Sequence, residues 1–286
     1  SILFIFVIIT SLSKAFLYRE IFCEKYTGNE KLDGKTVVIT GANTGLGKEA
    51  AIQFASRGAR VVMACRDLDK CHKARVDVVL RTGNKQVKCS QLDLASLKSI
   101  NEFVDRFKQK EKNIHILINN AGVMRCPKTL TEDGFEMQIG VNHFGHFLLT
   151  NLLIDLLKAS KPSRIVNVAS RAHYRGTINF DDINSDKSYS ESKAYNQSKL
   201  ANVLFTRELA KKLKGSGVFV YAADPGIVNT EIGRHMGYYK SYFSSLFAKP
   251  FLWLFLRSPK QGVQTILYCA LSEQLASEEF SGKYFS

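Results

Sequence analysis

Apolar and polar positions alternate with a regular rhythm from Lys35 to the C-terminus of this 286-residue chain. Runs of strand length are rich in β-branched residues, and several are apolar at successive positions, which is typical of strands covered on both faces. These runs are residues 36–40 (TVVIT), 59–65 (ARVVMAC), 86–93 (QVKCSQLD), 114–119 (IHILIN), 164–170 (RIVNVAS), 218–223 (VFVYAA) and 283–286 (KYFS). Amphipathic stretches of helix length, such as residues 45–57 and 96–111, lie between them. The alternation predicts the α/β class: one doubly wound domain over residues 35–286, with a parallel sheet of about seven strands and helices on both faces.

The N-terminal segment breaks this rhythm, because residues 2–10 (ILFIFVIIT) are almost entirely apolar and residues 15–18 continue the trend. The apolar stretch is short for a transmembrane helix, which needs about 20 residues. A secretory signal peptide is the alternative, but no basic region precedes the run and no convincing cleavage site follows it. We expect residues 1–20 to be a membrane anchor and residues 21–34 a polar linker. The flanking basic residues would place the domain on the cytosolic side; they are Lys14, Arg19, Lys25, Lys31 and Lys35.

A second exception covers residues 237–259, which are crowded with aromatic side chains and contain Trp253, the only tryptophan. One interpretation is a lid over a lipophilic substrate. A second is contact with the membrane interface, where Lys240, Lys249 and Arg257 would meet lipid headgroups. Ordinary core packing is the third, and the composition leaves all three open. Residues 178–192 are polar and are predicted to be mostly loop.

The net charge and the cysteine content indicate which binding partners and which cellular compartment to expect. The formal net charge of +14 suits solubility, an anionic membrane or a phosphorylated small molecule. No nucleic-acid recognition motif occurs, so nucleic acid is not an expected partner. The six cysteines form no Cys-x-x-Cys pair, and we expect free thiols in a reducing compartment. His143 and His146 lie three residues apart, but no further ligands can be assigned and no metal site is expected.

A glycine-rich turn follows the first strand directly and opens a helix, in residues 40–50 (TGANTGLGKEA). Glycines allow a tight turn and close approach of a ligand, and the amides of a helix N-terminus suit a pyrophosphate. The spacing is G-x-x-x-G-x-G, which is neither a P-loop nor the common G-x-G-x-x-G. It predicts a Rossmann-type dinucleotide site; the candidate contacts are Gly41, Asn43, Thr44, Gly45, Leu46 and Gly47.

The end of the second strand bears on which dinucleotide binds. A carboxylate near this point would bind the ribose 2′-hydroxyl of NAD. Here Cys65 and Arg66 occupy the position, and Asp67 follows the arginine. A planar guanidinium suits a 2′-phosphate, so we expect the cofactor to be NADP(H), with Arg66 as its determinant.

One pattern occurs twice within residues 189–199 (YSESKAYNQSK), where a tyrosine precedes a lysine by four positions. Tyr189 precedes Lys193, and Tyr195 precedes Lys199. On a helix such a pair shares one face. The spacing alone does not distinguish a reactive pair from solvated surface, and the remaining motifs must decide.

Taken together, the motifs resemble the short-chain dehydrogenase/reductase family over the whole domain. NNAG (119–122) follows the fourth strand, Asn142 lies in VNHFGHFLLT, Ser170 ends VNVAS, and DPGIVNT (224–230) follows the sixth strand. Tyr195 lies at the family's usual distance beyond Ser170, whereas Tyr189 comes too early. The resemblance implies that Asn142, Ser170, Tyr195 and Lys199 are catalytic. It also implies further cofactor contacts at Asp93, Asn120, Ala121, Gly122, Tyr195, Lys199, Pro225, Gly226, Val228 and Thr230.

Within that family, several segments resemble the membrane-anchored retinol dehydrogenases. They are residues 125–127, 131–153, 162–168, 215–218 and 281–285. The resemblance implies NADP(H)-dependent interconversion of retinal and retinol, with reduction of all-trans-retinal favoured by cellular NADPH. It implies a membrane address, either the endoplasmic reticulum facing the cytosol or the mitochondrial inner membrane. Self-association into a homo-oligomer is left open. Asp224 and Ala169 depart from the usual residues of these relatives, and the chain ends just after the last strand.

The chemistry of carbonyl reduction fits these residue types. Reduction places negative charge on the carbonyl oxygen, so a proton donor is needed there. The resemblance assigns that role to Tyr195, and a lysine cation nearby favours the phenolate and would lower its pKa. Lys199 would also anchor the cofactor ribose. Ser170 would hold the substrate oxygen, and Asn142 would support a water relay.

Three rival functions remain at this stage. The first is another substrate class, such as steroids or lipid-derived aldehydes. The second is a non-catalytic NADPH-binding regulator at a membrane, against which the intact Ser170, Tyr195 and Lys199 argue. The third is a membrane tether that uses only the N-terminal and aromatic segments.

Overall fold

The computed structural model describes residues 25–235 and 256–286. Its centre is a seven-stranded, all-parallel sheet in the order β3-β2-β1-β4-β5-β6-β7. The strands are β1 (Thr36–Thr40), β2 (Arg60–Cys65), β3 (Val87–Gln91), β4 (Ile116–Asn119), β5 (Ser163–Val168), β6 (Val218–Ala223) and β7 (Tyr284–Phe285). The predicted α/β class and doubly wound parallel sheet are therefore confirmed.

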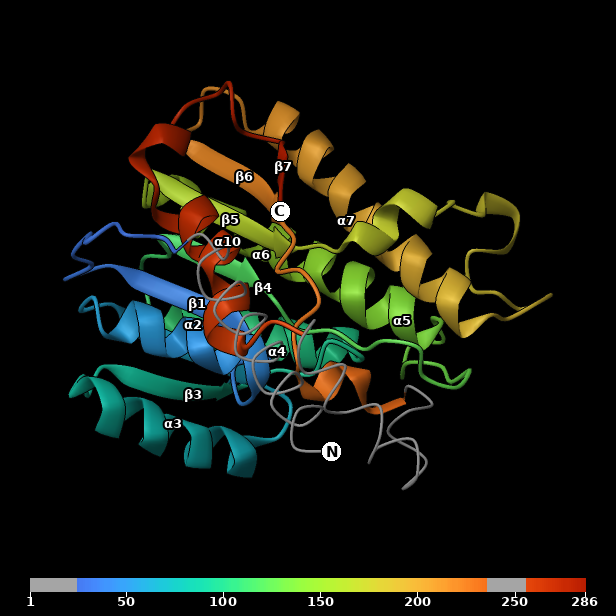
Figure 1. Cartoon of the computed structure of the whole chain (residues 1–286), viewed down its shortest axis with the longest axis horizontal. Coiled ribbons are helices and arrows are strands. Elements are labelled where there is room, and N and C mark those ends of the chain that lie inside the picture. Colours follow the sequence, from blue (N-terminus) through green and yellow to red (C-terminus); the bar gives the residue numbers. More distant parts are fainter. Residues whose placement is uncertain (1–24, 236–255) are drawn as a thin grey trace, which may run out of the picture.

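Helices cover both faces of the sheet. The longer ones are α2 (Gly45–Ala55), α3 (Leu68–Thr82), α4 (Leu97–Lys110), α6 (Gly145–Ala159), α7 (Glu191–Lys212) and α10 (Pro259–Leu271). Apolar residues of α2, α3 and α10 form one buried cluster, and those of α4, α6 and α7 form the other. Figure 1 shows α10, from the end of the chain, lying beside α2 from its beginning.

Short helical segments follow the carboxyl ends of the strands. They are α5 (Met137–Ile139), the π-helix η1 (Gly140–Phe144), and the 3-10 helices η2 (Arg171–Arg175), η3 (Phe180–Asp182) and η4 (Glu231–His235). A further 3-10 helix, η5 (Glu273–Leu275), follows α10 instead, and the carbonyl of Ser272 before it accepts from Arg164 near the start of β5. Two predicted strand runs extend too far at the carboxyl edge of the sheet: residues 86–93 continue past β3, which ends at Gln91, and residues 164–170 continue past β5, which ends at Val168. The overshoot arises because the sequence stays apolar or β-prone where the chain turns into the functional loops.

Helix ends follow side-chain capping. Ser96 accepts a hydrogen bond from the backbone amide of Ser99 and begins α4, as the predicted segment 96–111 anticipates. Ser258 and Gln261 form a capping box at α10, with Pro259 at its first position. Ser258 and Pro259 end the aromatic segment 237–259, for which lid, membrane contact and core packing were all left open. Residues 237–255 of that segment lie outside the described residues, as do the expected anchor at residues 1–20 and residues 21–24 of the linker. Over the described ranges, every helix is too short or too polar to cross a bilayer.

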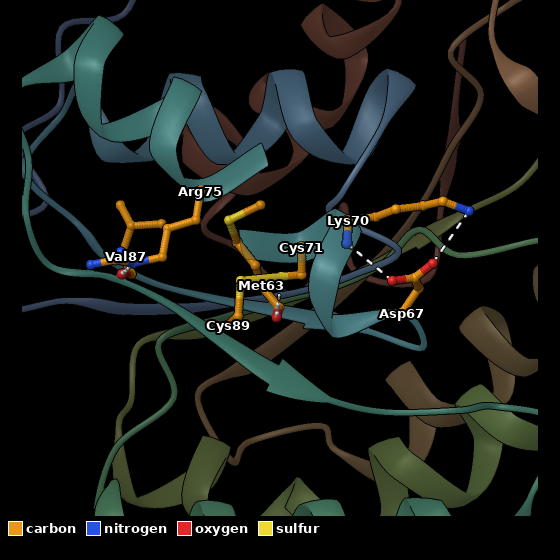
Figure 2. The surroundings of a disulfide bond; sticks show 7 residues. All are labelled: Met63, Asp67, Lys70, Cys71, Arg75, Val87 and Cys89. Atoms are coloured by element: carbon orange, nitrogen blue, oxygen red, sulfur yellow. Dashed lines mark hydrogen bonds and ion pairs between the residues drawn. A yellow bond between two sulfur atoms is a disulfide. The ribbon is translucent and has the colours of Figure 1, made fainter. Parts of the chain in front are cut away.

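The cysteines correct one expectation. Cys71 of α3 and Cys89 of β3 form a disulfide, with their Cα atoms 6.0 Å apart (Figure 2). The prediction of six free thiols is therefore wrong for this pair, and the reducing-compartment argument built on it no longer stands. Cys65, Cys126 and Cys269 are free and buried. Eighteen residues separate the bonded pair, and only the packing of α3 against β3 brings them together.

Thr40, the last residue of β1, connects β1 to the loop after β4. At this point the chain segments that follow the two strands pass to opposite faces of the sheet. The buried hydroxyl oxygen of Thr40 accepts from the backbone amides of Asn120 and Ala121, both at 2.9 Å. It also lies 2.8 Å from Nε2 of His146. Nδ1 of His146 faces the backbone carbonyl of Asn142 at 3.0 Å, and a carbonyl only accepts, so Nδ1 carries the proton. Burial lowers the pKa of His146 to about 4, so the ring is neutral and Nε2 accepts from the Thr40 hydroxyl.

Replacing Thr40 by valine tests this junction, because valine keeps the shape and removes the hydroxyl. Ala121 N and His146 Nε2 would lose their partner inside the protein. We expect Thr40→Val to lower the free energy of unfolding by about 3 kcal/mol, measured by chemical denaturation of the detergent-solubilised chain. Thr36→Val is the matched control at the other end of β1, where the threonine hydroxyl makes no hydrogen bond with another described residue; this substitution should change stability little. Equal effects of the two substitutions would contradict the junction.

Candidate active site

A cavity of about 600 Å³ opens along the carboxyl ends of the strands, around the junction of β1 and β4. In doubly wound sheets this switch point is the usual ligand site. Every residue predicted to bind the cofactor lines the cavity, from Gly41 to Thr230, and so do Ser170, Tyr195 and Lys199. Asn142 is the one predicted site residue that does not. The structure thus gathers segments that are up to about 190 positions apart in the chain (230 minus 41), although their individual roles stay predictions.

The glycine turn has the shape that a closely bound diphosphate needs. Gly41 and Gly45 have φ of +64° and +53°, in the left-handed region that favours glycine. A Cβ on Gly47 would lie 2.4 Å from the carbonyl oxygen of Gly41, so only glycine fits there. Helix α2 begins at Gly45, and the Thr44 side chain does not cap it. The first amides of α2 therefore remain for a ligand, and this cradle fits the pyrophosphate of a dinucleotide.

Arg66 and Asp67 lie at the far end of the cavity, where β2 leads into α3. The Asp67 carboxylate caps α3 by accepting from the backbone amide of Lys70 at 3.0 Å, and this bond lowers the pKa of Asp67. The ammonium of Lys70 lies 3.2 Å from the same carboxylate (Figure 2). Lys70 also lines the cavity, which sequence analysis missed, although a basic residue in the first turn after Arg66 was a visible signal. The Asp67 carboxylate thus already bonds to the first turn of α3 and to Lys70, while Arg66 is exposed.

Tyr195 and Lys199 lie one turn apart on α7 and both are buried, at 8% and 3% exposure. The Lys199 ammonium is 5.7 Å from the centroid of the Tyr195 ring. It donates a hydrogen bond of 2.9 Å to the carbonyl of Val168, the last residue of β5. One N–H is used in this way, so the remaining two can face the cavity that Lys199 lines.

Burial controls the protonation of this pair. Burial raises the pKa of Tyr195 to about 12, although a hydrogen bond with the Ser170 side chain opposes the rise. Burial lowers the pKa of Lys199 to about 8, and the charge of Asp224 opposes the fall. The sequence led us to expect a tyrosine pKa lowered by Lys199. Removal of the phenol from water raises its pKa by more than the neighbouring groups lower it, so Tyr195 is a neutral phenol over the physiological pH range.

Ser170 stands directly beyond β5 and begins the 3-10 helix η2. Its hydroxyl oxygen accepts from the amide of Ala172 at 3.2 Å, and its carbonyl accepts from Nδ1 of His173 at 2.7 Å. These two bonds fix the residue at the cavity wall beside Tyr195. A substrate oxygen placed against Ser170 and Tyr195 would therefore meet two hydroxyl groups.

Asn142 is fully buried in the π-helix η1, behind the cavity wall. Its side-chain oxygen accepts from the amide of Val123 at 2.8 Å, and its side-chain nitrogen donates to the Val123 carbonyl and to the Ser198 hydroxyl, both at 2.9 Å. The Asn142 side chain thus connects the loop after β4 to Ser198 of α7, which lies between Tyr195 and Lys199 in the sequence. This geometry makes Asn142 a positioning residue, and the predicted water relay stays a prediction.

Tyr189 differs from Tyr195 in its position and in its hydrogen-bond partners. Its hydroxyl donates to the carbonyl of Cys126 at 2.7 Å and accepts from the side-chain nitrogen of Gln138 at 2.8 Å. It therefore fastens the loop after β4 and does not line the cavity. Its partner in the repeated pattern, Lys193, is exposed. Helix α7 begins at Glu191, slightly earlier than the predicted end of the polar loop at residue 192.

The two described parts of the chain contain no group of three or more potential metal ligands close together. Nδ1 of His143 lies 3.2 Å from the side-chain oxygen of Asn202, and His146 is held by Thr40 and Asn142. Both histidines thus have structural partners.

Known proteins share this arrangement. Residues 35–238 match the family described as short chain dehydrogenase. Retinol dehydrogenase 13 of Homo sapiens is 55% identical over 255 residues, which cover 89% of this chain and 76% of that protein. Retinol dehydrogenase 12 of Homo sapiens is 54% identical over 262 residues, covering 90% of this chain and 79% of that protein.

Solved structures agree in fold. The crystal structure of an uncharacterised protein from Mycobacterium paratuberculosis superposes with a TM-score of 0.68 at 39% identity, covering 87% of this chain and 82% of the other. RhlG of Pseudomonas aeruginosa, solved as an active-site complex with NADP, gives a TM-score of 0.69 at 22% identity, covering 89% of this chain and 95% of that one. The extent of the family match and the identity to the retinol dehydrogenases show that the chain is an oxidoreductase that belongs to the short-chain dehydrogenase family.

Proposed function

We propose that this protein is an NADP(H)-dependent retinol dehydrogenase that in cells reduces all-trans-retinal to retinol. The observation that carries the proposal is the meeting of Ser170, Tyr195 and Lys199 at one end of the cavity whose other end holds Arg66. The names of the relatives at 54–55% identity supply the substrate class. The glycine cradle at the start of α2 supplies a site for the pyrophosphate.

The residues of the chain would act at the substrate oxygen. The hydroxyl of Ser170 would hold that oxygen, and Tyr195, a neutral phenol, would donate the proton that completes the alcohol. A bound nicotinamide supplies the hydride that the carbonyl carbon receives. Lys199 would support the phenolate that remains on Tyr195 and would donate its free N–H groups to the cofactor ribose.

The choice of NADP(H) rests on charge at the end of β2. Arg66 and Lys70 both line the cavity there, and the nearby carboxylate of Asp67 is engaged by α3. Two cations, next to a carboxylate whose oxygens already accept hydrogen bonds within the protein, favour the 2′-phosphate of NADP over the 2′-hydroxyl of NAD. The physiological carbonyl could instead be a steroid or a lipid-derived aldehyde, which the same hydroxyl pair at Ser170 and Tyr195 would accept.

Tyr195→Phe should lower turnover of all-trans-retinal with NADPH by about 10²–10⁴-fold, because it removes the proton donor and keeps the ring. Binding of NADPH, followed by fluorescence, should persist. Tyr189→Phe is the matched control, since its hydroxyl holds the loop at Cys126 and not the substrate. A panel of alkanals and steroids tested with the unaltered chain would identify the other substrate classes. Absence of turnover with every carbonyl would contradict the enzymatic proposal.

Arg66→Ala should raise the KM for NADPH by roughly ten- to a hundredfold, because a charge-assisted hydrogen bond is worth about 1.5–3 kcal/mol. The KM for NADH should stay nearly unchanged. Arg81→Ala removes the same charge from the last turn of α3, outside the cavity lining, and should alter neither constant. A preference of the unaltered chain for NADH would contradict the role of Arg66.

We also propose that residues 1–20 anchor the protein in the membrane of the endoplasmic reticulum, facing the cytosol, or in the mitochondrial inner membrane. The apolar run at residues 2–10 and the basic residues after it support this. The full chain expressed in cells should remain in the membrane pellet after alkaline carbonate extraction, and fractionation would distinguish the two membranes. Release of the full chain into the supernatant would contradict the anchor.

A further inference from the structure

The chain segment that follows β6 forms one wall of the cavity. All of residues 225–232 except Asn229 line the cavity, and we call residues 225–232 the cover segment. The carbonyl of Ala223, just before this segment, accepts a hydrogen bond of 2.8 Å from the amide of Ala169, and Ser170 follows Ala169 directly. The cover segment therefore begins beside the strand end that carries Ser170, at the reactive end of the cavity.

The other end of the cover segment reaches the glycine turn. A Cβ on Gly45 would lie 3.0 Å from Cγ2 of Thr230, so Thr230 packs directly on the first residue of α2. A Cβ on Gly122 would lie 3.8 Å from Cδ1 of Ile232, which places Ile232 close to the loop after β4. A dinucleotide in the cavity would therefore have the cover segment along it, from the reactive end to the pyrophosphate cradle.

Arg257 attaches the cover segment to the start of α10, where it directly precedes the N-cap residue Ser258. Its backbone amide donates to the carbonyl of Ile227 at 2.7 Å, and its carbonyl accepts from the amide of Asn229 at 2.9 Å. Its side chain donates from Nη1 to the carbonyl of Pro225 at 3.2 Å. The half-buried Arg257 side chain, for which the sequence left a lipid contact open, is thus directed at the backbone of the cover segment.

The Arg257 guanidinium also lies directly against Gly226. This glycine has φ of +74°, and a Cβ on it would lie 3.0 Å from Nη1 and 3.1 Å from Cδ and Cζ of Arg257. The amide of Gly226 donates to the Asp224 carboxylate at 2.8 Å, so two side chains hold this turn. Because Arg257 does not itself line the cavity, it can act on a ligand only through the Pro-Gly turn.

We propose that Arg257 is a positioning residue that clasps the cover segment over the nicotinamide half of the bound dinucleotide and so determines how tightly that half is held. The inference rests on the proposed carbonyl reduction, which requires the nicotinamide beside Ser170 and Tyr195. The Arg257 side chain acts on Pro225 and Gly226, at that same end of the cavity. The adenosine half would lie at the opposite end, which is lined by Arg66 and Lys70.

Arg257→Ala tests the clasp, because it removes the side-chain contacts and keeps the backbone bonds to Ile227 and Asn229. We expect the dissociation constant of NADPH to rise roughly two- to tenfold, as for the loss of one hydrogen bond. The full chain in detergent would be titrated by nicotinamide fluorescence. The constant for NADH should rise by the same factor, unlike in Arg66→Ala. An unchanged affinity for NADPH in folded Arg257→Ala would overturn the proposal.

Adenosine 2′,5′-bisphosphate separates the clasp from a general loosening of the fold, because it has the 2′-phosphate and lacks the nicotinamide half. Its dissociation constant, measured by calorimetry, should be the same in Arg257→Ala and in the unaltered chain. Equal weakening of this ligand and of NADPH would assign the effect to the whole site and refute the clasp. Lys260→Ala removes an exposed cation from the first turn of α10 and is the matched control; it should alter neither constant.

If Arg257→Ala does not fold, Arg257→Lys provides the second test. Lysine keeps the cation and a donor for Pro225 but has no planar group to lie against Gly226. It should weaken NADPH relative to adenosine 2′,5′-bisphosphate, and an unchanged ratio of the two affinities would count against the proposal. Absence of retinal turnover by the unaltered chain would refute the proposed function, while the two affinities would still decide the role of Arg257.

Discussion

The hydroxyl group of Thr40 joins three segments that meet only in the folded chain, and the cavity depends on that meeting. β1 and β4 pair in the sheet up to Ile39 and Ile118, but the helices that follow them pack on opposite faces, so the loops beyond these strands need a connection of their own. Thr40 supplies it by accepting from the amides of Asn120 and Ala121 and donating to His146. These hydrogen bonds hold the glycine turn, the loop after β4 and η1 around the cavity. The side chain of Asn142 continues the connection from Val123 to α7, on which Tyr195 and Lys199 lie.

Burial sets the charge of the groups that surround this space. His146 is neutral because it is buried, and a neutral ring can accept a hydrogen bond from the Thr40 hydroxyl at Nε2. The same desolvation raises the pKa of Tyr195 and lowers that of Lys199, so the two residues of the pair resist the charged state. In the folded chain Tyr195 therefore carries its proton at neutral pH.

The sequence allowed the sheet, its strand positions and somewhat more than half of the cavity lining to be predicted, because the strand–helix rhythm and the motif order are local patterns. It did not reveal what depends on tertiary proximity. Cys71 and Cys89 are separated by eighteen residues and share no motif, yet α3 packing on β3 joins them. Asn142 was placed in the site by its motif, but only the fold shows that its amide is used to hold Val123 and Ser198. The distance from Ser170 already favoured Tyr195 over Tyr189, but only the fold shows that the Tyr189 hydroxyl contacts Cys126 and Gln138, which are distant in sequence.

The position of Asp224 at the end of β6 shows how the fold maintains a cation inside a desolvated site. A buried lysine tends to lose its proton unless nearby groups favour the charged form, and here Val168 offers a carbonyl and Asp224 a negative charge. Both come from adjacent strand ends, paired through the register of Val168 with Ala223. A pKa of about 8 leaves Lys199 mostly cationic at neutral pH but close to its midpoint, so small electrostatic changes at this edge alter its charge. The hydrogen bond from Lys199 and the position of Asp224 beside it therefore both depend on the register in which β5 pairs with β6.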